Sequence, residues 1–144
     1  MDHIQATCVS IDGRGVILRG PPGSGKSDLA LRLVDEGARL VADDLCALVF
    51  EKPHVVAVPP KHFPGCIEVR GLGILPVPSS GPVPIFLVCD LAPKGESERL
   101  PDTDYLELCT VAIRLIRADP FQVSTPARIR LALRVASGDI VPVS

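Results

Sequence analysis

An eight-residue stretch at positions 20–27 has the residue types and spacing of a phosphate-binding loop. It fits the pattern G-x-x-x-x-G-K-[ST] in full, with Gly20, Pro21, Pro22, Gly23, Ser24, Gly25, Lys26 and Ser27. In this pattern the glycines let successive backbone N–H groups point at phosphate oxygens, and the start of a helix adds partial positive charge. The lysine reaches the β- and γ-phosphates, and the serine hydroxyl takes a position on Mg²⁺. The stretch predicts binding of a nucleoside triphosphate or polyphosphate and leaves the reaction open.

Two adjacent carboxylates, Asp43 and Asp44, follow a short apolar segment soon after this loop. We expect the segment to be a strand, and strand carboxyl ends in an α/β sheet face the ligand crevice. One carboxylate there could hold Mg²⁺ or its water, and a second could act as base toward an incoming hydroxyl. Adjacent strand residues point to opposite faces, so the two should differ in role, unless one merely caps a turn.

A third group lies in the segment Glu-Val-Arg-Gly-Leu-Gly-Ile at positions 68–74. Glu68 and Arg70 are two apart, which on a strand places them on one face. A carboxylate beside a guanidinium suits a metal-bound polyphosphate with an incoming acceptor, although an exposed strand with an ion pair has the same pattern. Gly71 and Gly73 would allow the backbone to approach a ligand closely.

The elements that must position these groups follow from periodicity and turn residues. We expect a strand at 4–11, a turn at 12–15 and a second strand at 16–18, together a hairpin. A helix should begin at Lys26 and run to about Glu36. The remaining expectations are strands at 39–42, 45–50 and 55–58, a loop at 59–65, a strand followed by a loop at 67–77, a buried central strand at 85–91, a mobile polar connection at 92–104, one or two strands at 106–116 and a helix at about 125–136.

The composition fits one globular α/β domain spanning residues 1–144. The chain is 47% hydrophobic and 22% charged, so it can bury an aliphatic core. A net charge of -2 does not resemble the basic footprint of a nucleic-acid binder. No apolar run is long enough to span a bilayer and no signal pattern opens the chain, which favours a cytoplasmic protein.

Five cysteines and a group of C-terminal arginines are further candidates for function. Cys8, Cys46, Cys66, Cys89 and Cys109 form no C-x-x-C motif, so we expect buried, reduced thiols. The arginines fit either a solvated helix face or a docking or phosphate-sensing surface, and they are Arg114, Arg117, Arg128, Arg130 and Arg134.

Taken together, three stretches resemble the catalytic domain of the HPr kinase/phosphorylase family. They are the loop at 20–27, Gly-Ala-Arg-Leu-Val-Ala-Asp-Asp at 37–44, and Ile-Glu-Val-Arg-Gly-Leu-Gly-Ile at 67–74. The third is the most telling, because ordinary P-loop proteins lack it. The resemblance implies a P-loop-containing kinase core of the HPr kinase/PEP carboxykinase type, with a mixed sheet and few helices, in the short form of the family that lacks an N-terminal domain.

The resemblance also implies roles for individual residues. Lys26 would bind the phosphates of ATP, and Ser27 and Glu68 would hold Mg²⁺. One of Asp43 and Asp44, with a slight preference for Asp44, would accept the proton of a serine on an HPr-type phosphocarrier protein. Arg70 belongs to the segment that serves both the kinase direction and the reverse, phosphorylase direction. The family further implies a hexamer and a part in phosphotransferase regulation.

Two positions depart from the family pattern. The family's first-strand His has Gln5 in its place, with His3 two residues earlier, and the C-terminal arginine segment has Arg117 as its nearest counterpart. Two other functions therefore stay open: a small-metabolite kinase, which would need a basic lid, and a nucleotide-binding regulatory module without catalysis.

Overall fold

A computed structural model describes residues 2–92 and 104–143. In this part of the chain, eleven strands and two helices follow one another. The elements are β1 (Asp2–Ile4), β2 (Thr7–Ile11), β3 (Arg14–Arg19), α1 (Lys26–Asp35), β4 (Arg39–Ala42), β5 (Cys46–Glu51), β6 (His54–Val58), β7 (Cys66–Val69), β8 (Gly73–Pro76), β9 (Val83–Leu91), β10 (Asp104–Leu108), β11 (Val111–Ala118) and α2 (Thr125–Ala136). The mixed sheet with two helices confirms the predicted fold class.

The strands that lead to the site all point the same way. β9 pairs in parallel with β3 on one side and with β11 on the other. β2 lies antiparallel between β3 and β4, so β4 runs parallel to β3. The carboxyl ends of β4, β3, β9 and β11 therefore meet at one edge of the sheet, where α/β proteins place their ligands.

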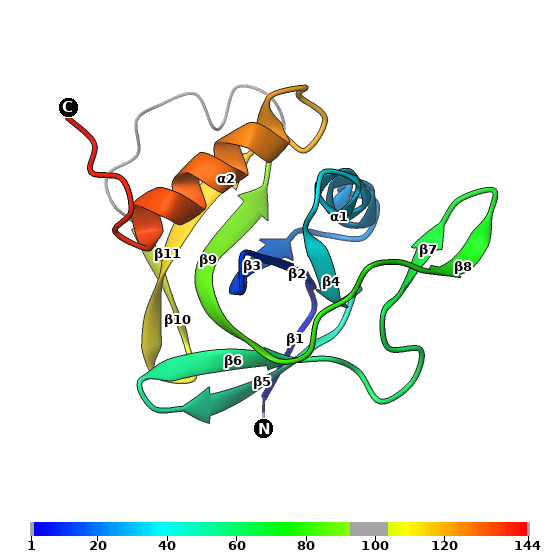
Figure 1. The fold of residues 1–144 in the computed structure, drawn as a ribbon, viewed down its shortest axis with the longest axis horizontal. Helices are drawn as coiled ribbons and strands as arrows, with labels where there is room; N and C mark the ends of the chain where they lie inside the picture. The colour runs from blue at the N-terminus through cyan, green and yellow to red at the C-terminus, as the bar shows by residue number, and fades with distance from the viewer. Residues whose placement is uncertain (1, 93–103, 144) are drawn as a thin grey trace.

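The sheet is strongly curved and buries an apolar layer on each face (Figure 1). One layer packs the two helices against the sheet and includes Leu18, Leu29, Leu87 and Ile129. The other lies between the central strands and the β5–β6 hairpin and includes Ile17, Val41 and Val88. Successive side chains of β3 and of β9 thus point into opposite layers, as expected for strands buried on both faces.

The first predicted strand is broken in two, which corrects the expectation of one strand at 4–11. β2 forms the expected hairpin with β3, turning at Asp12 and Gly13, which both have positive φ. β1 instead pairs antiparallel with β5, at the far end of the sheet path. The chain leaves one strand ladder for the other at Gln5 and Ala6. A hydrophobic pattern cannot reveal such a change, because it does not show which partner strand a segment joins.

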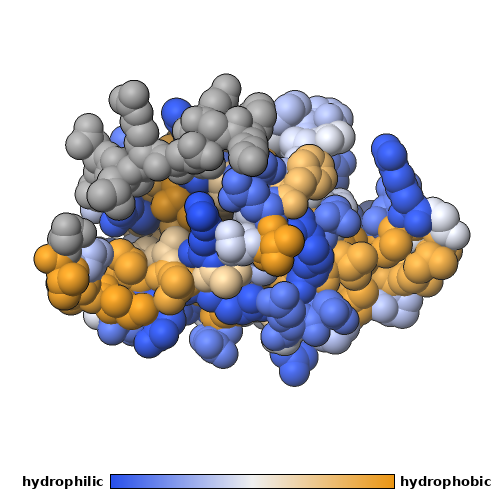
Figure 2. Space-filling view, turned by 90° about the horizontal axis from the view of Figure 1, so that it is seen from above, coloured by the Kyte–Doolittle hydropathy of each residue, from blue (hydrophilic) through white to orange (hydrophobic). Residues whose placement is uncertain are grey.

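Residues 67–77 were predicted as a strand followed by a loop, and this is also corrected. They belong to a separate two-stranded antiparallel sheet, β7–β8, whose turn contains Arg70, Gly71 and Leu72. The hairpin projects from the body of the molecule (Figure 1). The hairpin exposes apolar side chains, and Figure 2 shows apolar surface gathered at that end. The exposed apolar residues of the hairpin are Leu72, Ile74 and Leu75.

Most of the remaining elements match the prediction. α1, β4, β9 and α2 lie where they were expected, and β5–β6 and β10–β11 are hairpins. The connection predicted at 92–104 falls almost wholly outside the described residues. Cys8, Cys46 and Cys89 are buried as expected, whereas Cys66 and Cys109 are only partly buried. Among the described residues, no helix is both long and apolar enough to cross a membrane.

Candidate active site

The loop at 20–27 joins the end of β3 to the first residue of α1. Gly23 and Gly25 have φ of 80° and 100°, a left-handed conformation that side chains other than glycine rarely adopt. Ser24 donates its N–H to the Pro21 carbonyl at 3.1 Å, which closes the loop on itself. The backbone therefore curls over the start of α1, as a phosphate cradle requires.

Lys26 lies beneath this loop with only 8% of its surface exposed. Its Nζ donates to the carbonyl oxygen of Gly20 at 2.6 Å and approaches that of Pro21 at 3.4 Å. The ammonium group is thus held at the mouth of the loop, where incoming phosphate oxygens could replace the carbonyls as its partners.

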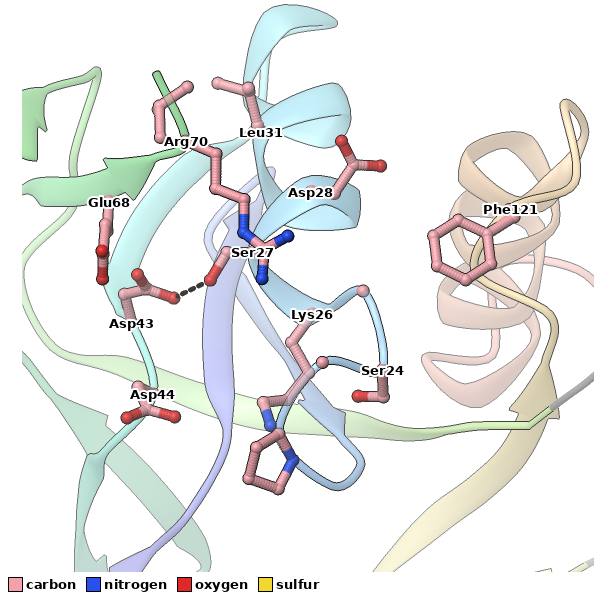
Figure 3. Close-up of a pocket in the computed structure, with 14 residues that line it drawn as sticks. Ser24, Lys26, Ser27, Asp28, Leu31, Asp43, Asp44, Glu68, Arg70 and Phe121 are labelled. Carbon is pink, nitrogen blue, oxygen red and sulfur yellow. Dashed lines mark hydrogen bonds between the residues drawn. The ribbon is translucent and has the colours of Figure 1, made fainter. Parts of the chain in front are cut away.

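The acidic pair follows β4 and faces the first turn of α1 (Figure 3). Asp43 Oδ1 accepts a hydrogen bond from Ser27 Oγ at 2.8 Å and another from Thr7 Oγ1 at 3.0 Å. Asp44 is exposed, has a φ of 69°, and donates its backbone N–H to Thr7 Oγ1 at 3.3 Å. The two carboxylates therefore have different surroundings: one contacts the loop serine, and the other points into open space.

The β7–β8 hairpin brings Glu68 and Arg70 to the same pocket (Figure 3). The prediction that they share one strand face is wrong, because β7 ends at Val69 and Arg70 already lies in the turn. The turn directs the guanidinium toward the first turn of α1, while Glu68 extends from β7 beside Asp43.

One pocket of about 530 Å³ collects most of the predicted site residues. Its predicted members are Pro22, Gly23, Ser24, Gly25, Lys26, Ser27, Asp43, Asp44, Glu68 and Arg70. Phe121, which the sequence did not single out, lines it as well. Asp43, Asp44 and Glu68 stand at one end and Phe121 at the other, with the loop and Asp28 between them (Figure 3).

A second pocket of about 510 Å³ opens on the other side of the loop. It shares Pro22, Lys26 and Asp44 with the first, and it contains Gly20 and Pro21. Asp44 therefore borders both spaces. Of the two candidates for the family's first-strand His, the wall of this pocket includes Gln5, whereas His3 lies exposed on β1 opposite Ala47.

A bidentate ion pair between Arg19 and Asp90 forms part of the second pocket. Arg19, the last residue of β3, donates to both oxygens of Asp90 on β9, at 2.7 and 2.9 Å. Hydrogen bonding to this carboxylate raises the pKa of the Arg19 guanidinium. Arg117 is the neighbour of Asp90 across the β9–β11 ladder, which places it near this edge. The other C-terminal arginines are divided between β11 (Arg114) and α2 (Arg128, Arg130 and Arg134).

Sequence reasoning missed several residues at this edge. Asp90 ends a long apolar run, and an acidic residue at that position is a recognisable signal of a strand end facing a ligand. Thr7, Arg19 and Phe121 carry no comparable signal, because their relevance depends on which strands become neighbours.

The fold and the site define a mixed-sheet α/β domain with a P-loop at the carboxyl edge of its parallel strands. The chain belongs to the family described as the HPr Serine kinase C-terminal domain, which matches residues 1–80.

Individual relatives agree with this assignment. The chain is 38% identical over 141 residues to an HPr kinase/phosphorylase of Lactobacillus acidophilus, covering 89% of this chain and 41% of the relative. It is 41% identical over 77 residues to an HPr kinase/phosphorylase of Clostridium acetobutylicum, covering 54% of this chain and 25% of that protein. The chain therefore spans less than half the length of these curated relatives.

A solved structure has the same fold. The structure of the Hpr(Ser) kinase/phosphatase from Coxiella burnetii superposes with a TM-score of 0.82, covering 96% of this chain and 98% of that one, at 24% identity. At this identity the likeness concerns the fold.

Proposed function

We propose that this chain is an ATP-dependent protein serine kinase that phosphorylates an HPr-type phosphocarrier protein. The observation that supports this best is the single pocket that joins the P-loop, the acidic pair and the β7–β8 hairpin. The names of the curated relatives support the choice of acceptor. Residues 1–144 would then act as one P-loop kinase domain.

The phosphate-binding part of the mechanism rests on the loop and on Lys26. The loop N–H groups and the Lys26 ammonium would bind the β- and γ-phosphates and neutralise charge as the phosphoryl group moves. Ser27 and Glu68 would hold Mg²⁺, with Asp43 beside them, because Mg²⁺ prefers a few protein oxygens together with phosphate oxygens and water. When bound, the ion neutralises phosphate charge. Arg70 would face the transferred group from the hairpin.

Asp44 is the better candidate for the base. Asp43 already accepts hydrogen bonds from Ser27 and Thr7, whereas Asp44 borders both pockets and is exposed to an acceptor entering from the second. The acceptor serine oxygen would form a bond to the γ-phosphorus while the bond to the bridging oxygen breaks and ADP leaves. The serine proton would pass to Asp44.

The same arrangement could serve the phosphorylase direction. There Asp44 would help inorganic phosphate attack the phosphoserine, which forms pyrophosphate and returns the serine hydroxyl. A cytoplasmic location, a homo-oligomer (a hexamer by family resemblance) and the absence of nucleic-acid and membrane partners complete the proposal.

The decisive experiment measures transfer of labelled γ-phosphate from Mg²⁺-ATP to a purified HPr-type carrier. Asp44→Asn should reduce the rate of transfer by about 100-fold or more, because a general base commonly accelerates a reaction by at least that factor. The affinity for ATP should change little. Asp43→Ala and Asp44→Ala test the pair. Asp35→Asn is the matched control, because Asp35 is an exposed carboxylate in the last turn of α1.

Other outcomes would favour the alternatives. An unlabelled carrier together with a labelled small molecule would indicate a metabolite kinase. ATP binding without transfer to any acceptor would indicate a regulatory module, which remains a coherent second candidate because Gln5 stands where the family has His.

A further inference from the structure

Phe121 is an exposed aromatic ring at the phosphate pocket, and the proposed function leaves it without a role. The chain has only four Phe, one Tyr and no Trp, so aromatic rings are scarce. Phe121 is 68% exposed and lies in the connection between β11 and α2. A large apolar side chain in this position lines the pocket rather than the core.

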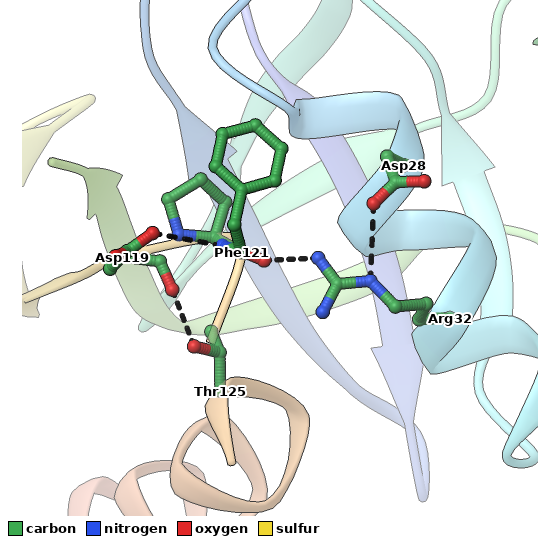
Figure 4. A network of polar contacts seen from close by, with 6 residues as sticks. Asp28, Arg32, Asp119, Phe121 and Thr125 are labelled. Carbon is green, nitrogen blue, oxygen red and sulfur yellow. Dashed lines mark hydrogen bonds and ion pairs between the residues drawn. The ribbon is translucent and has the colours of Figure 1, made fainter. Parts of the chain in front are cut away.

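The backbone that carries the ring is fixed by hydrogen bonds (Figure 4). The buried carboxylate of Asp119 accepts the N–H of Phe121 at 2.9 Å. The Thr125 hydroxyl donates to the Asp119 carbonyl, and the Arg32 guanidinium donates to the Pro120 carbonyl. Because Arg32 belongs to α1, the helix that begins at the P-loop also anchors the loop that presents the ring.

The ring packs directly against the P-loop backbone. A Cβ placed on Gly25 would lie 3.0 Å from Phe121 Cζ and 3.3 Å from Pro120 Cβ. Glycine at this position therefore does two things: it allows the left-handed turn, and it leaves room for the ring. Such an approach places the tip of the aromatic ring next to the backbone amides that would hold phosphate.

The two ends of the pocket differ in chemistry, and so do the two ends of a nucleotide. Asp43 follows β4, the P-loop follows β3, and Phe121 follows β11, so the three groups lie in order along the sheet edge. With phosphates on the loop and the terminal phosphate toward Asp43 and Glu68, the base would lie toward Phe121 (Figure 3).

We infer that Phe121 is the stacking platform for the purine base of the bound nucleoside triphosphate, an inference that rests on the proposed function. Aromatic rings bind bases by offset stacking, and the large face of a purine gains most. Stacking does not read the edges of a base, so ATP and GTP should bind with similar affinity.

The test compares binding of Mg²⁺-ATP and Mg²⁺-tripolyphosphate by calorimetry, without a carrier. Phe121→Ala should weaken ATP binding by about 5- to 150-fold, the range that corresponds to loss of one base-stacking ring, and leave tripolyphosphate binding unchanged. Phe63→Ala is the matched control, since Phe63 is a 71% exposed ring outside both pockets.

A second variant keeps the inference testable if Phe121→Ala folds poorly. Because the chain has no Trp, Phe121→Trp introduces a single indole that retains stacking, and ATP should quench its fluorescence whereas tripolyphosphate should not. The same substitution at Phe63 should give no quenching. Equal ATP affinity in Phe121→Ala and wild type, parallel loss of both ligands, or an unquenched indole would overturn the inference. Failure of carrier phosphorylation would refute only the proposed reaction, because base stacking is measured here by binding alone.

Discussion

Among single residues, Thr7 shows how the site depends on a side chain far from any motif. Its buried hydroxyl donates to Asp43 Oδ1 and accepts the N–H of Asp44, so one oxygen fixes both members of the acidic pair. Asp44 has a left-handed φ of 69°, which side chains tolerate only when their surroundings hold them. Thr7 therefore acts as a positioning residue for the pair.

We expect Thr7→Val to preserve shape and remove this hydroxyl. The loss should lower the free energy of unfolding by about 1–3 kcal/mol, since the Asp44 N–H loses its partner and a carboxylate loses a donor. It should also raise the Mg²⁺ concentration needed for ATP binding. Thr7→Ser keeps the hydroxyl and should behave like wild type in denaturant unfolding and calorimetry. Wild-type stability and Mg²⁺ dependence in Thr7→Val would show that the hydroxyl is not needed.

At the scale of elements, the β7–β8 hairpin carries Glu68 and Arg70 but belongs to a sheet of its own. Ile67 is the one buried side chain of this hairpin: it is 1% exposed and packs into the layer that contains α1, with the partly buried Val69 against the same layer. The residue beside the proposed metal ligand is therefore the anchor of the hairpin.

Ile67→Ala should lower the free energy of unfolding by about 2–5 kcal/mol, because it leaves a cavity in that layer. It should also weaken Mg²⁺-ATP binding by loosening Glu68. Ile74→Ala, on the exposed side of the same hairpin, should change stability by less than about 0.5 kcal/mol. Denaturant unfolding distinguishes the two variants, and equal losses would mean that the hairpin is not anchored through Ile67.

Local sequence signals predicted the positions of helices and strands more reliably than they predicted which strands pair with one another. The P-loop, α1 and the strand before the acidic pair follow from short-range patterns, and each lies where it was expected. The turn at Arg70 was missed although β7 and β8 are neighbours in the chain, because Gly71 and Gly73 were interpreted as points of close approach to a ligand. The break after Ile4 was missed because it depends on which distant strand each segment joins. Phe121 was missed for the same reason: only the β9–β11 pairing brings its loop to the P-loop.

At the scale of the whole molecule, β9 ties the two apolar layers into one body. Leu87 and Cys89 pack with the helices, while Ile85 and Val88 pack under the β5–β6 hairpin. Since β9 contributes side chains to both layers, disruption of the packing in one layer should also disrupt the packing in the other. The domain should therefore unfold in one cooperative transition.

Thiol labelling can test this, because buried cysteines lie in both layers. Burial raises the pKa of Cys89 from 9.0 to about 12, so at pH 8 its thiol should stay protonated and unreactive until unfolding. Cys46, in the other layer, should become reactive at the same denaturant concentration, whereas the partly exposed Cys66 should react in the native protein. Earlier labelling of Cys46 than of Cys89 would indicate two independent layers.

The central place of β9 also bears on how the protein is made. Its partner β3 leads into the P-loop near the start of the chain, yet β9 itself, and β11 beyond it, are synthesised much later. Contacts between segments so distant in sequence form slowly and only once both are present. On the ribosome, the P-loop residues would emerge well before β9 and β11, so a nascent chain should gain the ability to bind nucleotide only after β11 has emerged.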